Sequence, residues 1–265
     1  MWTFDSDDEL VDAIRERYSN FGLREEWMTS FLSLGEDYLR NNTLGPRQKT
    51  ALNEYLRDAG FIERNRKSTE LCDVVRFGYS LGSLSVLSVW AIIWTNLCHN
   101  SGIFLWWANQ PPGNYTRESM LQELRQTDKR ERTLTNITNS LISTLQSTPI
   151  GKDLRQGEVI KSGRSRIVQK IGHPKLNLVE VIYAFYMFAR KHEMFSISIE
   201  DMEPYVESPQ KIFCITSAEL ADVLGSSKSE KLFKVTWTND KVYLDLDEGL
   251  NEVDVLKMCI STGGG

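Results

Sequence analysis

The chain has 265 residues, of which 41% are hydrophobic, 10% aromatic and 25% charged. These values are ordinary for globular proteins, so they exclude a disordered or fibrous chain and leave room for two or three packed units. The net charge of -5 excludes a uniformly basic nucleic-acid binder.

The charge is unevenly distributed along the chain. Residues 40–67 carry seven Lys/Arg against three Asp/Glu, and residues 117–172 carry eleven against six, so the remaining residues hold a charge of -14. Two basic islands in an acidic chain favour local contacts with anions. The alternative is that these charges simply face solvent.

The cysteine and histidine spacing gives no sign of a metal or disulfide framework. Cys72, Cys98, Cys214 and Cys259 are far apart in the sequence, which predicts reduced thiols in a cytoplasmic protein. The three histidines lack metal-ligand spacing, so we expect no metal and no cofactor. The N-terminal residues are acidic and amphipathic rather than signal-like, and polar residues interrupt the apolar stretch 81–107, which predicts a buried core helix and no membrane partner.

The predicted elements begin with an N-terminal helical segment, residues 1–42, in which apolar residues recur at helical spacing over 7–19 and 24–41. A first winged-helix-like unit is predicted over 43–110, including the buried, Trp-rich helix. Its first helix starts near Pro46 and ends at Gly60, and a basic turn leads to a new helix capped by Ser68 or Thr69. Its candidate DNA contacts are Arg47, Lys49, Arg64, Arg66 and Lys67.

A second winged-helix-like unit is predicted over 111–174, after the break at "NQPPGNYT". Helices are expected over 116–126 and 132–147, the second with an apolar stripe at Leu134, Ile137, Leu141 and Leu145. Its opposite face carries short, uncharged polar side chains after two arginines, which suits base contacts in the major groove. These candidates are Arg130, Arg132, Thr135, Asn136, Asn139, Ser140 and Ser143. The alternative is that the polar face meets another part of the same protein.

The segment "GEVIKSGRSRIVQKIGHP" alternates in character around Ser162-Gly163, which predicts a β-hairpin. Basic side chains at its outward positions would suit phosphate contacts, which give affinity without specifying sequence. The candidate contacts are Lys161, Arg164, Arg166 and Lys170.

Residues 175–265 are predicted to form an acidic α+β domain. Between 193 and 257 there are fourteen acidic and six basic residues, so this end is expected to face away from DNA and to suit a basic protein partner. The predicted fold class is therefore mainly α with small β hairpins, in tandem winged-helix-like units followed by a helical and hairpin domain.

No familiar catalytic motif occurs in the chain, so no catalytic residue and no small-molecule substrate are predicted. The sequence resembles a bacterial domain family of unknown function in the order and character of five segments. They are "STELCDVV", "SVWAIIWTNL", "RTLTNITNSLIST", "VIYAFYMFA" and "FKVTWTNDKVYLDL". Genes of that family neighbour those of phosphoadenosine-phosphosulfate-reductase-like proteins and DNA phosphorothioation or phage-defence loci. The resemblance covers roughly residues 43 to 255 and implies a DNA-modification or defence context. The reductase's Ser-Gly-Gly-x-Asp-Ser loop is absent, so the chain is not expected to be the sulfur-transfer enzyme.

Two main hypotheses follow. The first is a non-catalytic accessory subunit that binds double-stranded DNA through a helix-turn-helix and a basic wing, within a protein complex. The second is a protein-interaction scaffold that docks a reductase-like or other partner subunit. An unrecognised enzyme is the third alternative, because active sites are assembled in space and do not always leave a sequence motif.

Overall fold

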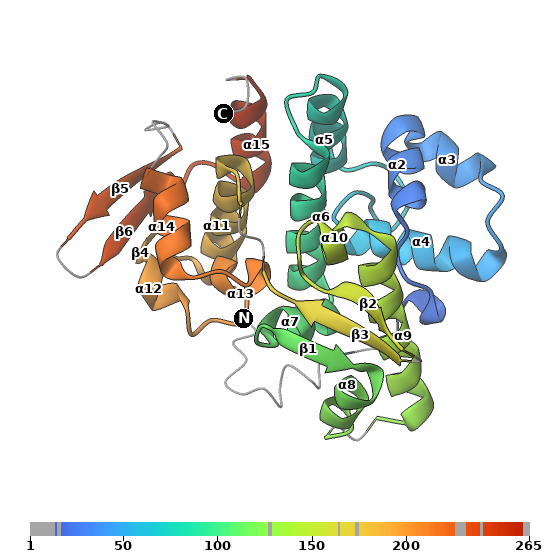
Figure 1. Ribbon diagram of the computed structural model, residues 1–265. Coiled ribbons are helices and arrows are strands. Elements are labelled where there is room, and N and C mark those ends of the chain that lie inside the picture. Colours follow the sequence, from blue (N-terminus) through green and yellow to red (C-terminus); the bar gives the residue numbers. More distant parts are fainter. Residues whose placement is uncertain are drawn as a thin grey trace.

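Helices form most of the structure, and two small antiparallel sheets complete it (Figure 1). The structure, a computed structural model, describes residues 14, 17–126, 129–163, 165–172, 175–225, 232–238 and 241–261. The predicted class, mainly α with small β hairpins, is confirmed. Most of the helix predicted over residues 7–19 lies outside the described residues.

The N-terminal elements follow one another closely. They are η1 (Tyr18–Asn20), α2 (Glu25–Leu34), α3 (Glu36–Asn41), α4 (Pro46–Asp58) and α5 (Glu70–Ser80). The helix predicted over 24–41 is divided at Gly35, whose φ of 61° ends α2. Gly60, with φ of 73°, follows α4 as expected. A single bridge between Ile62 and Ser68 closes the basic turn, and the Thr69 hydroxyl caps α5 by accepting from the Cys72 amide at 3.2 Å.

The Trp-rich segment forms α6 (Val86–Asn100) and α7 (Gly102–Asn109), and both are buried along most of their length. Their indole groups also find partners, as buried Trp requires. Trp94 donates to the Ile212 carbonyl at 2.7 Å, and Trp107 donates to the Gln156 carbonyl at 2.6 Å. Within the described part of the chain, no helix has the length and apolar character needed to cross a membrane.

The first sheet and the helices around it follow the Trp-rich helix α6. Its elements in chain order are α7, β1 (Gly113–Thr116), α8 (Arg117–Leu124), α9 (Glu131–Ser147), α10 (Pro149–Lys152), β2 (Glu158–Ser162) and β3 (Ser165–Lys170). The strand order is β1-β3-β2, all antiparallel, with Lys161 opposite Arg166 in the hairpin. The hairpin predicted around Ser162-Gly163 is thus present.

The same order of elements recurs in the C-terminal part. It consists of α11 (Leu178–His192), β4 (Ser196–Ser198), α12 (Ile199–Met202), α13 (Pro209–Phe213), α14 (Ser217–Gly225), β5 (Phe233–Trp237), β6 (Val242–Leu246) and α15 (Glu252–Ser261). The strand order is β4-β6-β5, so in both sheets the third strand lies between the first and the second. The sequence predicts a hairpin in this part of the chain but not the repeated order of elements.

The apolar side chains gather in two clusters. One extends from Ile14 to Val168 with additions from the C-terminal part, and it contains residues on both sides of positions 42 and 110. The other lies within residues 181–259. Helices α6 and α11 stand side by side where the two parts meet, with the two sheets on different sides of the molecule (Figure 1). The four cysteines form no disulfide, and Cys214 is half-buried whereas the other three are buried.

Candidate nucleic-acid interface

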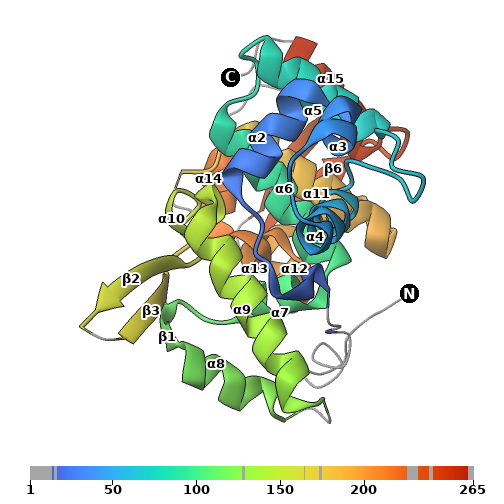
Figure 2. The ribbon, with the colours of Figure 1, turned by 90° about the vertical axis from the view of Figure 1, so that its right-hand side faces the viewer.

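Helix α9 and the β2–β3 hairpin lie beside one another at the surface (Figure 2). The apolar stripe of α9 packs inward as its helical spacing predicts, since Leu134, Ile137, Leu141 and Leu145 are each at most 2% exposed. The helix is therefore fixed by the core, and its opposite side is turned outward with the hairpin at one flank.

Four exposed cations mark this surface. Arg130 and Arg132 stand at the amino end of α9, and Lys161 and Arg166 face each other on the hairpin. None of the four forms an ion pair with any residue that the structure describes. Unpaired cations at a surface are available to phosphate groups, which bind them with release of counterions.

The acidic residue between the two arginines is already paired. Arg125 donates to Glu131 through two hydrogen bonds, of 2.9 and 2.6 Å. These bonds lower the pKa of the Glu131 carboxyl group. Among the residues that the structure describes, the carboxylate between these two arginines is therefore engaged by Arg125 and does not pair with them.

The hairpin is tied to the helix. Arg166 donates a hydrogen bond to the Gln146 side chain on α9 at 3.2 Å. Arg166 shares a face of its strand with Val168, because side chains two positions apart point to the same side. Val168 is buried, whereas Arg166 is nearer the turn and is exposed. The tip of the hairpin thus extends past the core and places its cations beside α9.

The neutral face of α9 is only partly accessible. Thr135, Asn136, Asn139 and Ser143 are half-buried. The Asn139 carbonyl oxygen accepts a hydrogen bond from the Arg117 guanidinium on α8 at 3.0 Å, so its amide nitrogen is oriented by that contact. These side chains keep the short length that close approach to base edges requires.

The prediction that Ser140 belongs to the exposed face is wrong. Ser140 is 1% exposed, and its hydroxyl donates to the Ile137 carbonyl at 2.8 Å. The segment after η1 crosses α9 about one turn further along, where the Leu23 amide donates to the Thr144 hydroxyl at 2.9 Å and a Cβ added to Gly22 would collide with the Thr144 nitrogen and the Ser143 Cβ. Small residues on α9 permit this close crossing. For this part of the face, the alternative of an internal contact is therefore correct.

Lys170 is also not a surface contact. Lys170 is 1% exposed, and its ammonium donates to the carbonyls of Trp107, Ala108 and Gln110 at 2.7–2.8 Å. It closes the carboxyl end of α7, where carbonyl groups lack intrahelical partners. Burial lowers the pKa of Lys170 to about 8. The physical reason is that Lys170 shares a face of its strand with the buried Val168 and, unlike Arg166 on the same face, lies at the end of the strand that is away from the turn and over the core.

The remaining candidates are more widely spread. Arg164 lies outside the described residues. Arg47 lies over the Phe21 ring at 5.8 Å, in a cation–π contact. In the first unit, Lys49 on α4 is half-buried, and the turn that follows α4 exposes its three cations. These are Arg64, Arg66 and Lys67.

Sequence reasoning missed two residues of this surface, Arg117 and Gln146. Arg117 follows the capping residue of α8, and its contact with Asn139 depends on how α8 packs on α9, which spacing does not reveal. The position of Gln146 on this surface could have been predicted from its spacing in the sequence. It lies seven residues after Asn139, which places it two helical turns further along the same face.

The fold and this surface define a mainly helical α+β protein in which a helix and a small hairpin together present unpaired cations. Among solved structures, the chain is similar to one described as "SspB crystal structure", with a TM-score of 0.72 and 15% sequence identity, over 96% of this chain and 89% of that chain. At that identity the likeness shows the fold alone. No protein-family model and no curated protein matches the sequence.

Proposed function

We propose that this protein is a non-catalytic, DNA-binding accessory subunit of a bacterial DNA-modification system, of phosphorothioation type, or of a phage-defence system. The observation that carries the DNA-binding part is the set of four unpaired, exposed cations on α9 and the adjacent hairpin. The system context rests on the resemblance of the sequence to the family found beside such loci.

The order of elements supports this assignment. Winged-helix domains consist of a helix, a strand, two helices and a hairpin, with the third strand between the first and the second. The elements from α7 to β3 follow this arrangement, with the short helix α10 added before the hairpin. In such domains the second helix after the first strand enters the major groove with its amino-terminal residues at the base edges. That helix is α9 here, and its amino end carries Arg130 and Arg132.

The C-terminal unit has the same order but not the same charge. Its corresponding helix, α14, contains Glu219 and Asp222 and no Lys or Arg. Carboxylates at that position would repel phosphates. We therefore assign duplex binding to the unit that contains α9, and we expect the C-terminal unit to face away from the DNA.

The two parts of the surface would have different tasks. Arg130, Arg132, Lys161 and Arg166 would contact phosphates, which position a protein on DNA without reading its sequence. Thr135, Asn136 and Asn139 would contact base edges, since Asn bonds adenine through two hydrogen bonds. Their half-buried positions require the helix to enter the groove closely.

Duplex binding over a series of salt concentrations tests this proposal. Fluorescence anisotropy with a labelled duplex should give a steep fall in affinity with salt for the wild type. Arg132→Ala, Lys161→Ala and Arg166→Ala should each weaken binding several-fold and reduce the slope of log K against log salt by about 1. Lys234→Ala is the matched control, because Lys234 is exposed on the corresponding hairpin of the C-terminal unit. The assignment would be overturned if Lys234→Ala lost as much duplex affinity as the other variants, or if the wild type did not bind duplex DNA.

A second candidate function is the scaffold that docks a partner protein. It is favoured by three apolar side chains exposed near the carboxyl end of α5, namely Phe77 at 59%, Leu81 at 59% and Val86 at 49%. Exposed apolar side chains that gather together mark interaction surfaces. Under this alternative, a partner protein that co-purifies with the wild type would be lost with Phe77→Ser, and DNA affinity would not change.

A further inference from the structure

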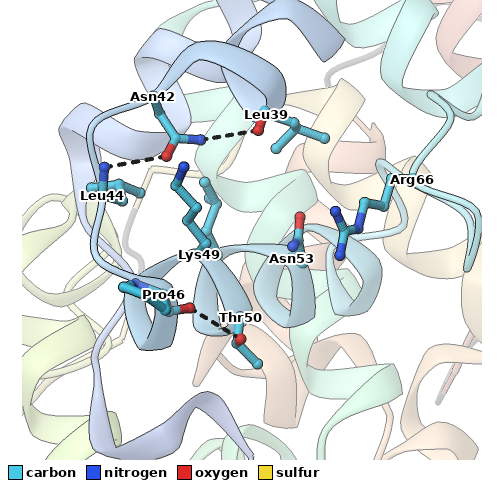
Figure 3. A pocket seen from close by; sticks show the side chains of 9 residues that line it. Leu39, Asn42, Leu44, Pro46, Lys49, Thr50, Asn53 and Arg66 are labelled. Atoms are coloured by element: carbon cyan, nitrogen blue, oxygen red, sulfur yellow. Dashed lines mark hydrogen bonds between the residues drawn. The ribbon is translucent and has the colours of Figure 1, made fainter.

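A pocket of about 290 Å³ lies beside α4, away from the α9 surface. Its walls come from the end of α3, the α3–α4 connection, the amino-terminal half of α4 and the turn that contains Arg66 (Figure 3). The pocket is near the lower end of the size range of small-molecule sites. It is larger than an inorganic phosphate ion needs and has room for an attached sugar.

The charge of this pocket has one sign. Lys49 and Arg66 both line it, and no Asp or Glu is among the described residues that do so. Neither cation forms an ion pair with a residue that the structure describes. Two cations that face one cavity repel each other unless an anion joins them. The arrangement therefore favours an anionic occupant.

A buried amide without a partner points into the same space. Asn53 is 9% exposed, lines the pocket, and its side chain makes no hydrogen bond with the described residues. In Figure 3 this amide lies between the Lys49 and Arg66 side chains. The polar atoms of this amide are not sealed off from solvent, so the amide is open to the pocket and can bond to an occupant.

The other two polar side chains of the pocket are already engaged. Asn42 donates to the Tyr38 and Leu39 carbonyls and accepts from the Leu44 amide. The Thr50 hydroxyl donates to the Pro46 carbonyl at 3.2 Å. These bonds hold the wall in shape and leave Lys49, Asn53 and Arg66 as the groups with unused donors.

The position of Arg66 is set by its turn. Its amide donates to the Glu63 carbonyl at 2.9 Å, and its φ of 67° is left-handed, which is uncommon for a residue other than glycine. The Asn65 side chain accepts from the Lys67 amide at 2.8 Å and closes the same turn. The guanidinium therefore reaches the pocket from a fixed backbone.

We propose that this pocket binds a phosphate group, with Lys49 and Arg66 as its cations and the Asn53 amide as a hydrogen-bond donor. The phosphate belongs either to a free nucleotide or to a DNA backbone that also contacts α9. The proposal gives Lys49 and Arg66 a shared ligand, and it does not depend on duplex binding by α9 and the hairpin, which contribute no residue to the pocket.

Isothermal titration calorimetry of the full chain tests the proposal with matched probes. The probes are inorganic phosphate, 2′-deoxyadenosine 5′-monophosphate, the same nucleoside without phosphate, and a short duplex. Lys49→Gln and Arg66→Gln should each weaken phosphate-dependent binding about tenfold or more, because each removes a charge-assisted hydrogen bond. Lys67→Gln is the control, since Lys67 is an exposed neighbour of Arg66 that does not line the pocket.

Asn53→Leu provides a second, independent variant. Replacing an unpartnered buried amide with an apolar group of similar size should leave thermal stability unchanged or raise it, whereas phosphate binding should fall several-fold. A merely structural Asn53 would show the opposite pattern, with lower stability and unchanged binding.

The probes also distinguish the two sources. Nucleotide binding that Arg66→Gln weakens identifies a free nucleotide, and an effect of Arg66→Gln on duplex affinity alone identifies a backbone phosphate. If neither nucleotide nor duplex binding responds to Lys49→Gln or Arg66→Gln, or if Lys67→Gln has the same effect, the pocket is not a phosphate site. Lys161→Ala should leave nucleotide binding unchanged, which separates this result from the test of the α9 surface.

Discussion

The Arg166 guanidinium on β3 donates to the Gln146 side chain on α9 across 3.2 Å, so the hairpin and the helix of the proposed DNA surface are joined to each other. This contact places a cation of the hairpin at a defined distance from the helix. An arginine has five donors, and one contact with an amide leaves others for a phosphate.

If Gln146 acts by holding Arg166, Gln146→Ala should weaken duplex binding less than Arg166→Ala does. The double variant should bind as Arg166→Ala alone, because Gln146 has no effect once its partner is absent. Dissociation constants for the four proteins, measured at one salt concentration, give this comparison. If the losses in binding free energy of the two single variants add up in the double variant, Gln146 contacts DNA directly.

Lys170→Met should destabilise the protein by about 2–4 kcal/mol, because it leaves buried carbonyl groups at the carboxyl end of α7 without a donor. Lys161→Met is the matched control on the same hairpin and should change stability by less than about 0.5 kcal/mol, since Lys161 is exposed. Urea unfolding measures both. Unchanged stability in Lys170→Met together with lost duplex affinity would restore Lys170 as a DNA contact.

Gly22→Ala should cost about 1–3 kcal/mol, because the added Cβ would meet the backbone and Cβ atoms of α9 at about 2.5 Å and neither neighbour can move freely. Gly45→Ala is a suitable control, since its nearest neighbour would be the Gln48 side chain at 3.6 Å. The difference in free energy of unfolding tests the crossing. If Gly22→Ala is as stable as the control, the N-terminal segment does not cross α9 closely at Ser143 and Thr144.

Acid should destabilise the protein through a buried group of charged residues around Glu207. Lys191 donates to Glu207 at 2.7 Å, and His192 Nε2 lies 3.7 Å from the same carboxylate. Although burial acts to raise it, the nearby His192 side chain and the hydrogen bond and charge of Lys191 lower the pKa of Glu207 from 4.5 to about 2. Burial lowers the pKa of His99 from 6.5 to about 3.

In both cases the unfolded chain binds the proton more tightly than the folded one. The free energy of unfolding should therefore fall as the pH decreases, from about 6.5 toward 3 for His99 and from about 4.5 toward 2 for Glu207. His99→Leu should flatten the upper part of this dependence by up to a few kcal/mol, because the variant has no imidazole to protonate. Urea unfolding between pH 4 and 7 measures the effect. A slope that is the same with and without His99 would contradict the assignment.

Local patterns were enough to predict several elements of the fold. Leu134, Ile137, Leu141 and Leu145 recur at helical spacing, and the resulting helix begins at Glu131, one residue before its predicted start. The glycine at the turn and the alternation around it predicted the β2–β3 hairpin. Thr69, a short side chain before an apolar run, predicted the start of α5. Each of these depends on residues that are neighbours in the sequence.

Side-chain exposure on those same elements could not be read from the sequence. Ser140 and Ser143 have the same chemistry and both follow the polar pattern of α9, yet Ser140 is fully buried and Ser143 is only half-buried. Lys161 and Lys170 belong to one hairpin, and the difference between them is their distance from the core. The type of a polar residue does not show which distant segment packs on its side chain.

The sequence by itself determined the class of fold, the helix and hairpin of the proposed DNA surface, and the two basic islands, because periodicity, capping and charge act over a few residues. The tertiary structure alone decided that Lys170 closes α7, that the order of elements repeats in the C-terminal part, and that Lys49, Asn53 and Arg66 share one pocket. Those relationships depend on which distant segments pack together, and packing is fixed by the shape of the whole core.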